Sequence, residues 1–212
     1  MSNSANDTRM YWKIQWTLVC LLIFSASVSA QALIPAGIDT AQYQRIFQLS
    51  DNLHRFQRAG HFGYMNRGGK EVILPEYDMA QDFEKGLAKV MLHGKIGMID
   101  TLGGSILPII YDEIWEFRNG IAMLMLNGKF GFVNQDGHII IPPIYDAGQH
   151  ASDSILVVRK GLLSGYISST GTAITPIKFE IAEPYYDGQA RVRVEGIWFF
   201  INAQGVCVRG CQ

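Results

Sequence analysis

The 212-residue chain carries little charge and little cysteine. Asp, Glu, Lys and Arg make up 17% of the residues, whereas a typical soluble domain has about 25%, and the formal net charge is −1. This balance excludes the basic surface by which proteins bind nucleic acids, and also the polybasic segment that binds an anionic membrane surface. We therefore expect no nucleic acid among the partners.

The sequence also lacks long apolar runs. The apolar run near the N-terminus is short. Arg9 and Lys13 precede the run Trp16–Phe24, which the small residues Ser25–Ala30 follow. A basic end, a short apolar centre and small residues, in that order, are typical of a secretory signal peptide. The run falls short of the ~18 residues that a membrane-spanning helix needs, so we expect cleavage rather than anchoring.

We assign residues 1–30 to the signal peptide, with cleavage after Ala30. The sequence Ala30-Gln31-Ala32 also fits the cleavage pattern, and either Met1 or Met10 can be the start. The chain is therefore expected to be exported by a bacterium and to be periplasmic or secreted, with no membrane span after cleavage.

Only two cysteines, Cys207 and Cys211, remain once Cys20 has left with the leader. In an oxidising compartment an even number of cysteines is consistent with a disulfide, here one that closes a short C-terminal loop. Two free thiols are the alternative. The five histidines stand at no ligand spacing with these cysteines, so we expect no metal and no cofactor.

Glycine, at 22 of 212 residues, exceeds its usual share of about 7% and recurs with a period of 34 residues. The first series is Gly63, Gly97, Gly131 and Gly165, continued in register by Phe199; the second is Gly69, Gly103, Gly137, Gly171 and Gly205; the third is Gly60, Gly94, Gly128 and Gly196. Four units also contain a proline (Pro75, Pro108, Pro142, Pro176) before an aromatic–acidic pair (Tyr77-Asp78, Tyr111-Asp112, Tyr145-Asp146, Phe179-Glu180). Such self-similarity predicts a tandem array from about Tyr43 to Arg209.

The repeat is expected to be β-structure, although its period equals that of the two-helix tetratricopeptide repeat. Interior glycines and prolines destabilise a helix by roughly 1 and 3 kcal/mol each. Short apolar runs such as residues 86–92 and 155–159 are bounded by turn residues, as strands are. His93-Gly94, Asn127-Gly128 and Glu195-Gly196 are typical two-residue hairpin turns, in which glycine takes a positive φ. Each unit is thus predicted to be a three-stranded antiparallel meander.

An all-β chain of five units follows from this pattern. The units are expected at residues 52–75, 86–108, 120–142, 154–176 and 188–209, within a repeat domain of residues 52–212. Residues 31–51 form an N-terminal cap segment, in which residues 39–50 could make a short helix capped by Asp39 or Thr40. Neighbouring units would bury one another's apolar faces, stacked as a β-solenoid or curled into a small propeller-like array.

The unit resembles the WG repeat of bacterial proteins. Its pattern is an apolar or aromatic residue, Gly, an aromatic or apolar residue, Ile or Val, Asp or Asn, a turn with Gly, a β run, Pro and Tyr-Asp; residues 95–100 and 129–134 are examples. The Trp-Gly pair itself is absent, and its positions hold Phe62-Gly63, Ile96-Gly97, Phe130-Gly131, Ser164-Gly165 and Trp198-Phe199. The resemblance implies a β-rich array that acts in binding or scaffolding, without transferable catalytic residues.

The recurring acids Asp78, Asp112, Asp146 and Glu180 could in principle act as acid–base pairs or as calcium ligands. They occur once per unit, however, and a calcium loop needs several acids within a dozen residues. We therefore expect each to accept hydrogen bonds from backbone N–H groups in its turn, beside an aromatic residue that packs between units. Neither a Gly-x-Ser-x-Gly elbow nor a phosphate-binding Gly-x-Gly-x-x-Gly follows the leader, so no catalytic residue is nominated.

Binding residues are sought among the aromatic side chains that vary between units, because aromatic rings suit protein contacts and sugar stacking. Trp115 and Tyr186 are the candidates. Tyr185 aligns with Phe83 and Phe117, and Trp198 occupies the repeat's own core position, so we expect both to pack within the array.

The function expected from the sequence is non-enzymatic: binding or scaffolding of another envelope or secreted protein. A carbohydrate- or peptidoglycan-binding module that uses Trp115 is the alternative. A hydrolase of envelope polymers is a further alternative, and it would need a cleft with converging polar groups and perturbed acids.

Overall fold

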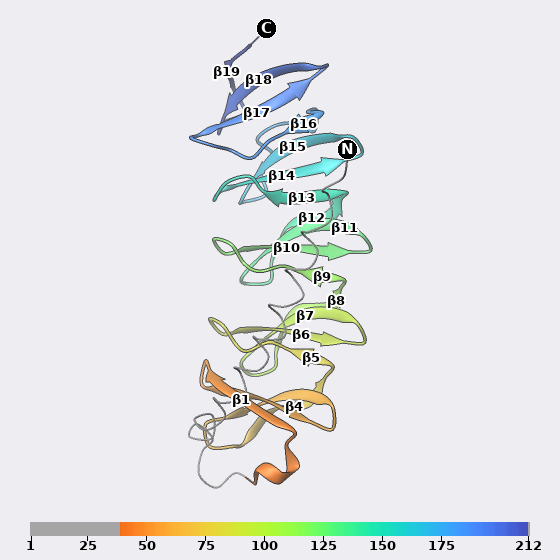
Figure 1. The fold of residues 1–212 in the computed structure, drawn as a ribbon, viewed down its shortest axis with the longest axis vertical. Helices are drawn as coiled ribbons and strands as arrows, with labels where there is room; N and C mark the ends of the chain where they lie inside the picture. The colour runs from red at the N-terminus through yellow and green to blue at the C-terminus, as the bar shows by residue number, and fades with distance from the viewer. Residues whose placement is uncertain (1–38, 212) are drawn as a thin grey trace, which may run out of the picture.

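The computed structural model describes residues 39–211, and the predicted signal peptide lies outside the described residues. In this part of the chain, nineteen strands form five antiparallel sheets. The sheets follow one another along the longest axis of the molecule, with the first and last at opposite ends (Figure 1). The predicted all-β class is therefore confirmed. No helix within residues 39–211 is long and apolar enough to cross a membrane.

Each sheet is one repeat unit. The first comprises β1 (Arg45–Ser50), β2 (Leu53–Arg58), β3 (His61–Asn66) and β4 (Glu71–Tyr77); the second β5 (Met79–Ala80), β6 (Leu87–Leu92), β7 (Lys95–Asp100) and β8 (Ser105–Tyr111). The third comprises β9 (Glu113–Ile114), β10 (Ile121–Leu126), β11 (Lys129–Asn134) and β12 (Ile139–Tyr145); the fourth β13 (Ala147–His150), β14 (Ile155–Lys160) and β15 (Leu163–Ser168). The fifth comprises β16 (Ile181–Ala182), β17 (Gln189–Val194), β18 (Ile197–Asn202) and β19 (Cys207–Arg209).

The prediction of three strands per unit was wrong for four of the five sheets, which have four strands. The segment after each Tyr-Asp pair, predicted to be a crossover, enters the next sheet as a short extra strand. The Asp112 N–H donates to the Met125 carbonyl at 2.9 Å, and β9 pairs with β10 directly afterwards. Pairing of this segment satisfies backbone groups that a free crossover would leave to water.

The helix predicted within residues 39–50 is also wrong. Asp39 does act as a cap, since its carboxylate accepts from the Ala41 N–H at 3.0 Å, but the turn is a single 3-10 turn at Thr40–Gln42. The following residues form β1, which pairs with β2. Tertiary pairing with an available strand edge overrides the weak local preference for a helix.

The fourth unit lacks the last strand of the predicted meander, which corresponds to β4, β8 and β12 in the other units. Its place is taken by an irregular segment that meets β15 only in isolated bridges. The Thr175 hydroxyl accepts from the Tyr166 N–H at 3.0 Å, where the other units carry the apolar residues Ile73, Leu107 and Ile141. A side-chain hydroxyl can replace the acceptor that a regular ladder would supply, so it competes with the strand.

The glycines of the first series are required by a close backbone approach. Phe130 pairs with Tyr145 and Phe132 with Ile141, so Gly131 alone faces the bulged residues 142–144. A Cβ on Gly131 would lie 2.5 Å from the Ile141 carbonyl oxygen, which no side chain tolerates. The fifth sheet has only the short strand β19 at this edge, and Phe199 accordingly replaces glycine there.

The glycines of the second series bring neighbouring sheets together. Gly137, with a φ of +79°, lies in the turn between β11 and β12, and a Cβ there would come within 2.2 Å of the Ile106 carbonyl oxygen in the preceding sheet. Buried apolar clusters fill the space between successive sheets. One of them contains Met98 and Leu107 from the second sheet and Leu124 from the third. The core is thus divided among the junctions rather than gathered in one centre.

Candidate functional site

The repeated acids tie one unit to the next. Asp146 accepts from the Lys129 ammonium of the third unit at 2.5 Å and from the Gly161 N–H in the hairpin turn of the fourth unit at 2.6 Å. Asp112 makes the equivalent contacts with Lys95, at 2.5 Å, and the Gly128 N–H, at 3.4 Å. The acids therefore do accept from turn N–H groups, but the turn belongs to the following unit.

The other two repeated acids, Asp78 and Glu180, make different contacts from Asp112 and Asp146. Asp78 accepts from the His93 N–H at 2.6 Å, in the turn of the second unit. Glu180 instead accepts from the Arg193 guanidinium at 2.7 Å. All four side chains are thus engaged in contacts at the junctions.

The electrostatic environment of these acids favours the carboxylate. The bound Lys95 ammonium holds the pKa of Asp112 below its usual range, and Lys129 does the same to the pKa of Asp146. A general acid in hydrolysis needs a raised pKa instead, so that it carries a proton near neutral pH. Nor do residues 39–211 contain a group of three or more His, Cys, Asp or Glu that could hold a metal ion.

The two aromatic binding candidates lie in different units and do not meet. Trp115 follows β9 and stacks on Phe130 with ring centroids 5.7 Å apart. Tyr186 stands beside a turn before β17 and is 87% exposed. No joint aromatic surface is formed by these two side chains.

The position of Trp115 can be compared with the equivalent positions of the neighbouring units. Grooves of about 210 and 220 Å³ open at two other junctions, beside Gln81 and Gln149, which occupy the register of Trp115 in their units. In the third unit the indole extends over Phe130 at the equivalent place. Trp115 therefore lies at the position where two other units have a groove.

Tyr185 packs as predicted, whereas Trp198 does not. The Tyr185 hydroxyl donates to the Asn202 carbonyl at 2.9 Å, and its ring contacts Tyr166 edge-on. Trp198 is exposed on the outer face of the fifth sheet, with the Arg191 guanidinium 4.3 Å from its ring centroid. The prediction of a core position for Trp198 was wrong, because no further sheet covers this face within the described residues.

Cys207 and Cys211 are brought together at the C-terminal edge of the fifth sheet. Their sulfurs are 2.09 Å apart in a disulfide, with Cα atoms separated by 5.9 Å. The bridge joins β19 to residue 211, close to the half-buried Phe199. It lies far along the chain from both aromatic candidates and contributes to no site with them.

A groove of about 290 Å³ opens between the second and third sheets, and we call it the Met98 groove. The residue at one position of the repeat differs in the unit beside this groove, and we call the residues at this position a row. Tyr64, Phe132, Tyr166 and Phe200 occupy the same register, and Met98 is the one non-aromatic member of the row. Tyr64 and Tyr166 cross to the following unit, where their hydroxyls donate to the carbonyls of Gln81 at 2.6 Å and Glu183 at 2.5 Å. Met98 has no hydroxyl to make this contact, and the Met98 groove opens beside it.

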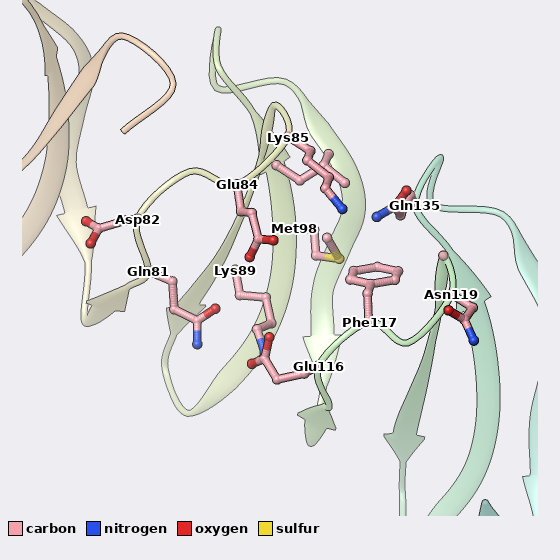
Figure 2. A pocket seen from close by; sticks show the side chains of 12 residues that line it. Gln81, Asp82, Glu84, Lys85, Lys89, Met98, Glu116, Phe117, Asn119 and Gln135 are labelled. Atoms are coloured by element: carbon pink, nitrogen blue, oxygen red, sulfur yellow. The ribbon is translucent and has the colours of Figure 1, made fainter. Parts of the chain in front are cut away.

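The Met98 groove has an apolar floor and a polar rim (Figure 2). Met98 and Phe117 form the floor. Lys89 pairs with Glu116 across the two sheets, and Lys85 extends toward Gln135. Further rim residues are Gln81, Asp82, Glu84 and Asn119. Sequence reasoning missed this site, although the single methionine in an otherwise aromatic row was a signal for it.

A second surface consists of exposed apolar side chains on the last strands β4, β8 and β12 and at the equivalent position of the fourth unit, and we call it the apolar ridge. It comprises Leu74, Pro108, Ile110, Pro142, Ile144 and Pro176. Leu74 is 66% exposed, Ile110 46% and Ile144 49%. Equivalent positions face the same way in each unit, so these side chains recur on one side of the array over four units, with Glu76 and Lys178 in the register of Ile110 and Ile144.

The family model of the WG containing repeat matches residues 62–95, 96–130, 130–161 and 165–198. The chain belongs to this family. Each match begins within one residue of the glycine of the first series, which makes the close backbone approach described above. No match is found among curated proteins.

Several solved structures show a distant similarity to this chain. Hsv2p of Kluyveromyces lactis is 12% identical, with a TM-score of 0.37, over 76% of this chain and 62% of that one. A eukaryotic initiation factor is 8% identical, with a TM-score of 0.42, over 82% and 56%. The Pan2 WD40 domain of Neurospora crassa is 12% identical, with a TM-score of 0.32, over 76% and 61%. The chain thus spans less than two thirds of the length of each.

Proposed function

We propose that this WG-repeat chain is a non-enzymatic binding protein of the bacterial cell envelope, periplasmic or secreted, that scaffolds another envelope or secreted protein. The observation that carries the proposal is the apolar ridge. Exposed apolar side chains that recur on one side of an array favour an interaction surface, because their exposure to water is unfavourable. The repeated acids, by contrast, are occupied in tying the units together.

We further infer that the repeats form an open, solenoid-like stack in solution rather than a closed propeller-like ring. The placement of the first and last sheets at opposite ends of the long axis supports this inference (Figure 1). An open stack presents the apolar ridge as an extended strip, which suits a partner that contacts several units at once.

The test is site-specific photo-crosslinking of the exported, tagged chain in cells, followed by capture and mass spectrometry. The photoreactive residue replaces Ile110 or Ile144 on the apolar ridge. Leu162 is the matched control, since it is 90% exposed and apolar but lies in a hairpin turn outside the ridge. We expect one envelope protein to be captured through positions 110 and 144 and not through 162.

Equal capture at all three positions, or none at the two ridge positions, would contradict the proposal. Co-sedimentation of the chain with murein, lost on replacing Trp115 or Tyr186 by alanine, would favour the carbohydrate- or peptidoglycan-binding alternative instead.

A further inference from the structure

The Met98 groove lies at the one junction where the row of Tyr64, Phe132, Tyr166 and Phe200 carries a methionine. At the junctions crossed by Tyr64 and Tyr166, an aromatic ring fills the inter-sheet space and its hydroxyl satisfies a backbone carbonyl. At the junction of the second and third sheets, the corresponding methionine leaves about 290 Å³ open. A unit that departs from the others can carry a binding site of its own, beside the surfaces that the recurring positions form together.

The floor of the groove suits an apolar side chain. Met98 is 2% exposed and Phe117 packs beside it, so the two present a small apolar surface at the bottom of a polar opening. A thioether on a flexible chain adapts to side chains of different shape, and methionine is over-used at binding surfaces for this reason. The volume fits one or two large side chains and not a large cofactor.

The rim offers groups of both charges together with amides. Asp82 is paired with Arg55 at 3.1 Å, and Lys89 with Glu116. Within residues 39–211, Glu84 and Lys85 form no salt bridge, and the side-chain amides of Gln81 and Gln135 make no hydrogen bond. Glu84 and Lys85 therefore present both charges at the rim, each without an ion-pair partner within residues 39–211.

A ligand that matches this rim carries donors, acceptors and both charges beside an apolar group. An extended peptide has this chemistry, because its main-chain amides pair with side-chain amides and its flanking residues supply the charges. We propose that the Met98 groove binds a peptide segment of a partner protein, with one apolar side chain on Met98 and Phe117 and its main chain along the rim. This inference rests on the proposed protein-binding function but uses a surface other than the apolar ridge.

The array itself suggests the variant that closes the groove. Replacement of Met98 by tyrosine restores the residue type of Tyr64 and Tyr166, whose hydroxyls reach a carbonyl 17 residues further along the chain. The equivalent acceptor for Met98→Tyr is the carbonyl of Trp115, so we expect the variant to fold and to fill the space. Met98→Leu conserves volume and chemistry and is the matched control.

The experiment selects a phage-displayed library of random linear peptides on the purified exported chain and measures the affinity of the enriched peptides by fluorescence polarisation. We expect peptides with an apolar residue flanked by charged residues. Their affinity should fall about tenfold or more for Met98→Tyr and stay within about twofold for Met98→Leu. In the chain labelled at its methionine methyl groups, the Met98 signal, identified by its loss in Met98→Leu, should shift on peptide addition.

Enriched peptides that bind Met98→Tyr as tightly as the native chain would overturn the inference. So would a library that yields no peptide, or a Met98 signal that moves only with murein fragments. These results are distinguishable from failure of the proposed function, which is decided by capture through positions 110 and 144.

Discussion

At the scale of single residues, the glycines of the WG repeat have different physical roles at different positions. Gly131 is required because a Cβ would collide with the backbone of the bulged strand β12. Gly128 is favoured only because it has a φ of +72° in a hairpin turn, with nothing within 4 Å of its added Cβ. The sequence shows both as one periodic feature, and only the packing separates them.

Replacing each of these glycines by alanine should therefore have unequal effects. Gly131→Ala forces backbone movement in a packed region and should lower the free energy of unfolding by about 3 kcal/mol. Gly128→Ala places a Cβ on a residue with a positive φ but causes no collision, so it should lower the free energy of unfolding by only about 1 kcal/mol. Denaturant unfolding of the two variants measures the difference, and equal losses would show that the close approach at Gly131 is relieved without strain.

Acid should weaken the array through Asp112 and Asp146. The Lys129 contact holds the pKa of Asp146 below its ordinary 3.8, so the folded state favours the carboxylate. Its contribution is present above that ordinary value and is lost as the pH falls through the lowered one. The midpoint of denaturant unfolding should accordingly fall between about pH 5 and about pH 2.

The variant Asp146→Asn should show a smaller acid-induced decrease than the native chain, since the side chain no longer titrates. Asp187→Asn serves as the control, because Asp187 forms no ion pair within residues 39–211. A decrease of the same size in all three proteins would assign the acid sensitivity to other groups.

Trp198 shows where residue-scale reasoning from sequence reaches its limit. Its register is that of Phe62, Ile96 and Phe130, which are half-buried, yet it is exposed beside Arg191 and Arg193. Periodicity identifies equivalent positions, but burial at a position depends on whether another sheet lies against it.

At the scale of elements, the hairpins were predictable and the short first strands were not. Dipeptides such as Asn127-Gly128 have φ values of 52° and 72°, as the hairpin turn requires, and they mark the strand ends within a residue or two. Strands β5, β9 and β16 have two residues each, too few for any period to be visible. The Met98 groove was missed for a related reason: a cavity arises between two units, and no single unit contains it.

The C-terminal strand β19 has three residues and is held by the disulfide at its end. Cys207→Ser should lower the free energy of unfolding by up to about 2 kcal/mol, because the loop that the bridge closes is short. Unfolding of the native chain with and without a reductant measures the same quantity. Mass spectrometry of the chain purified without reductant should show both cysteines oxidised, and free thiols there would contradict the prediction.

At the scale of the whole molecule, the division of the core among junctions implies cooperation between neighbours. The cluster that contains Tyr166 and Phe179 also contains Ala190, Val192 and Ile201 from the fifth sheet. Removal of residues 181–212 would expose half of that cluster to water. We expect the shortened chain to lose much of the stability of the fourth unit, and residues 79–111 alone to remain unfolded, as judged by circular dichroism and denaturant unfolding.

An intact fourth unit in the shortened chain would show that the units are independent. The shape can be tested on the purified chain of residues 31–212 by small-angle scattering. A compact protein of this size has a radius of gyration of about 16 Å, and the open stack should exceed it clearly. A value near that of a compact protein would favour a closed ring.

The way each junction is built bears on how such a protein can change its length over evolution. An acid of one unit binds the turn of the next, and a turn glycine of one unit rests on the strand before it. Duplication of any 34-residue stretch therefore brings its own interface with it. Because one methionine in place of tyrosine or phenylalanine accompanies the open groove, a duplicated unit could acquire a new binding position through a single substitution, while the older copies keep theirs.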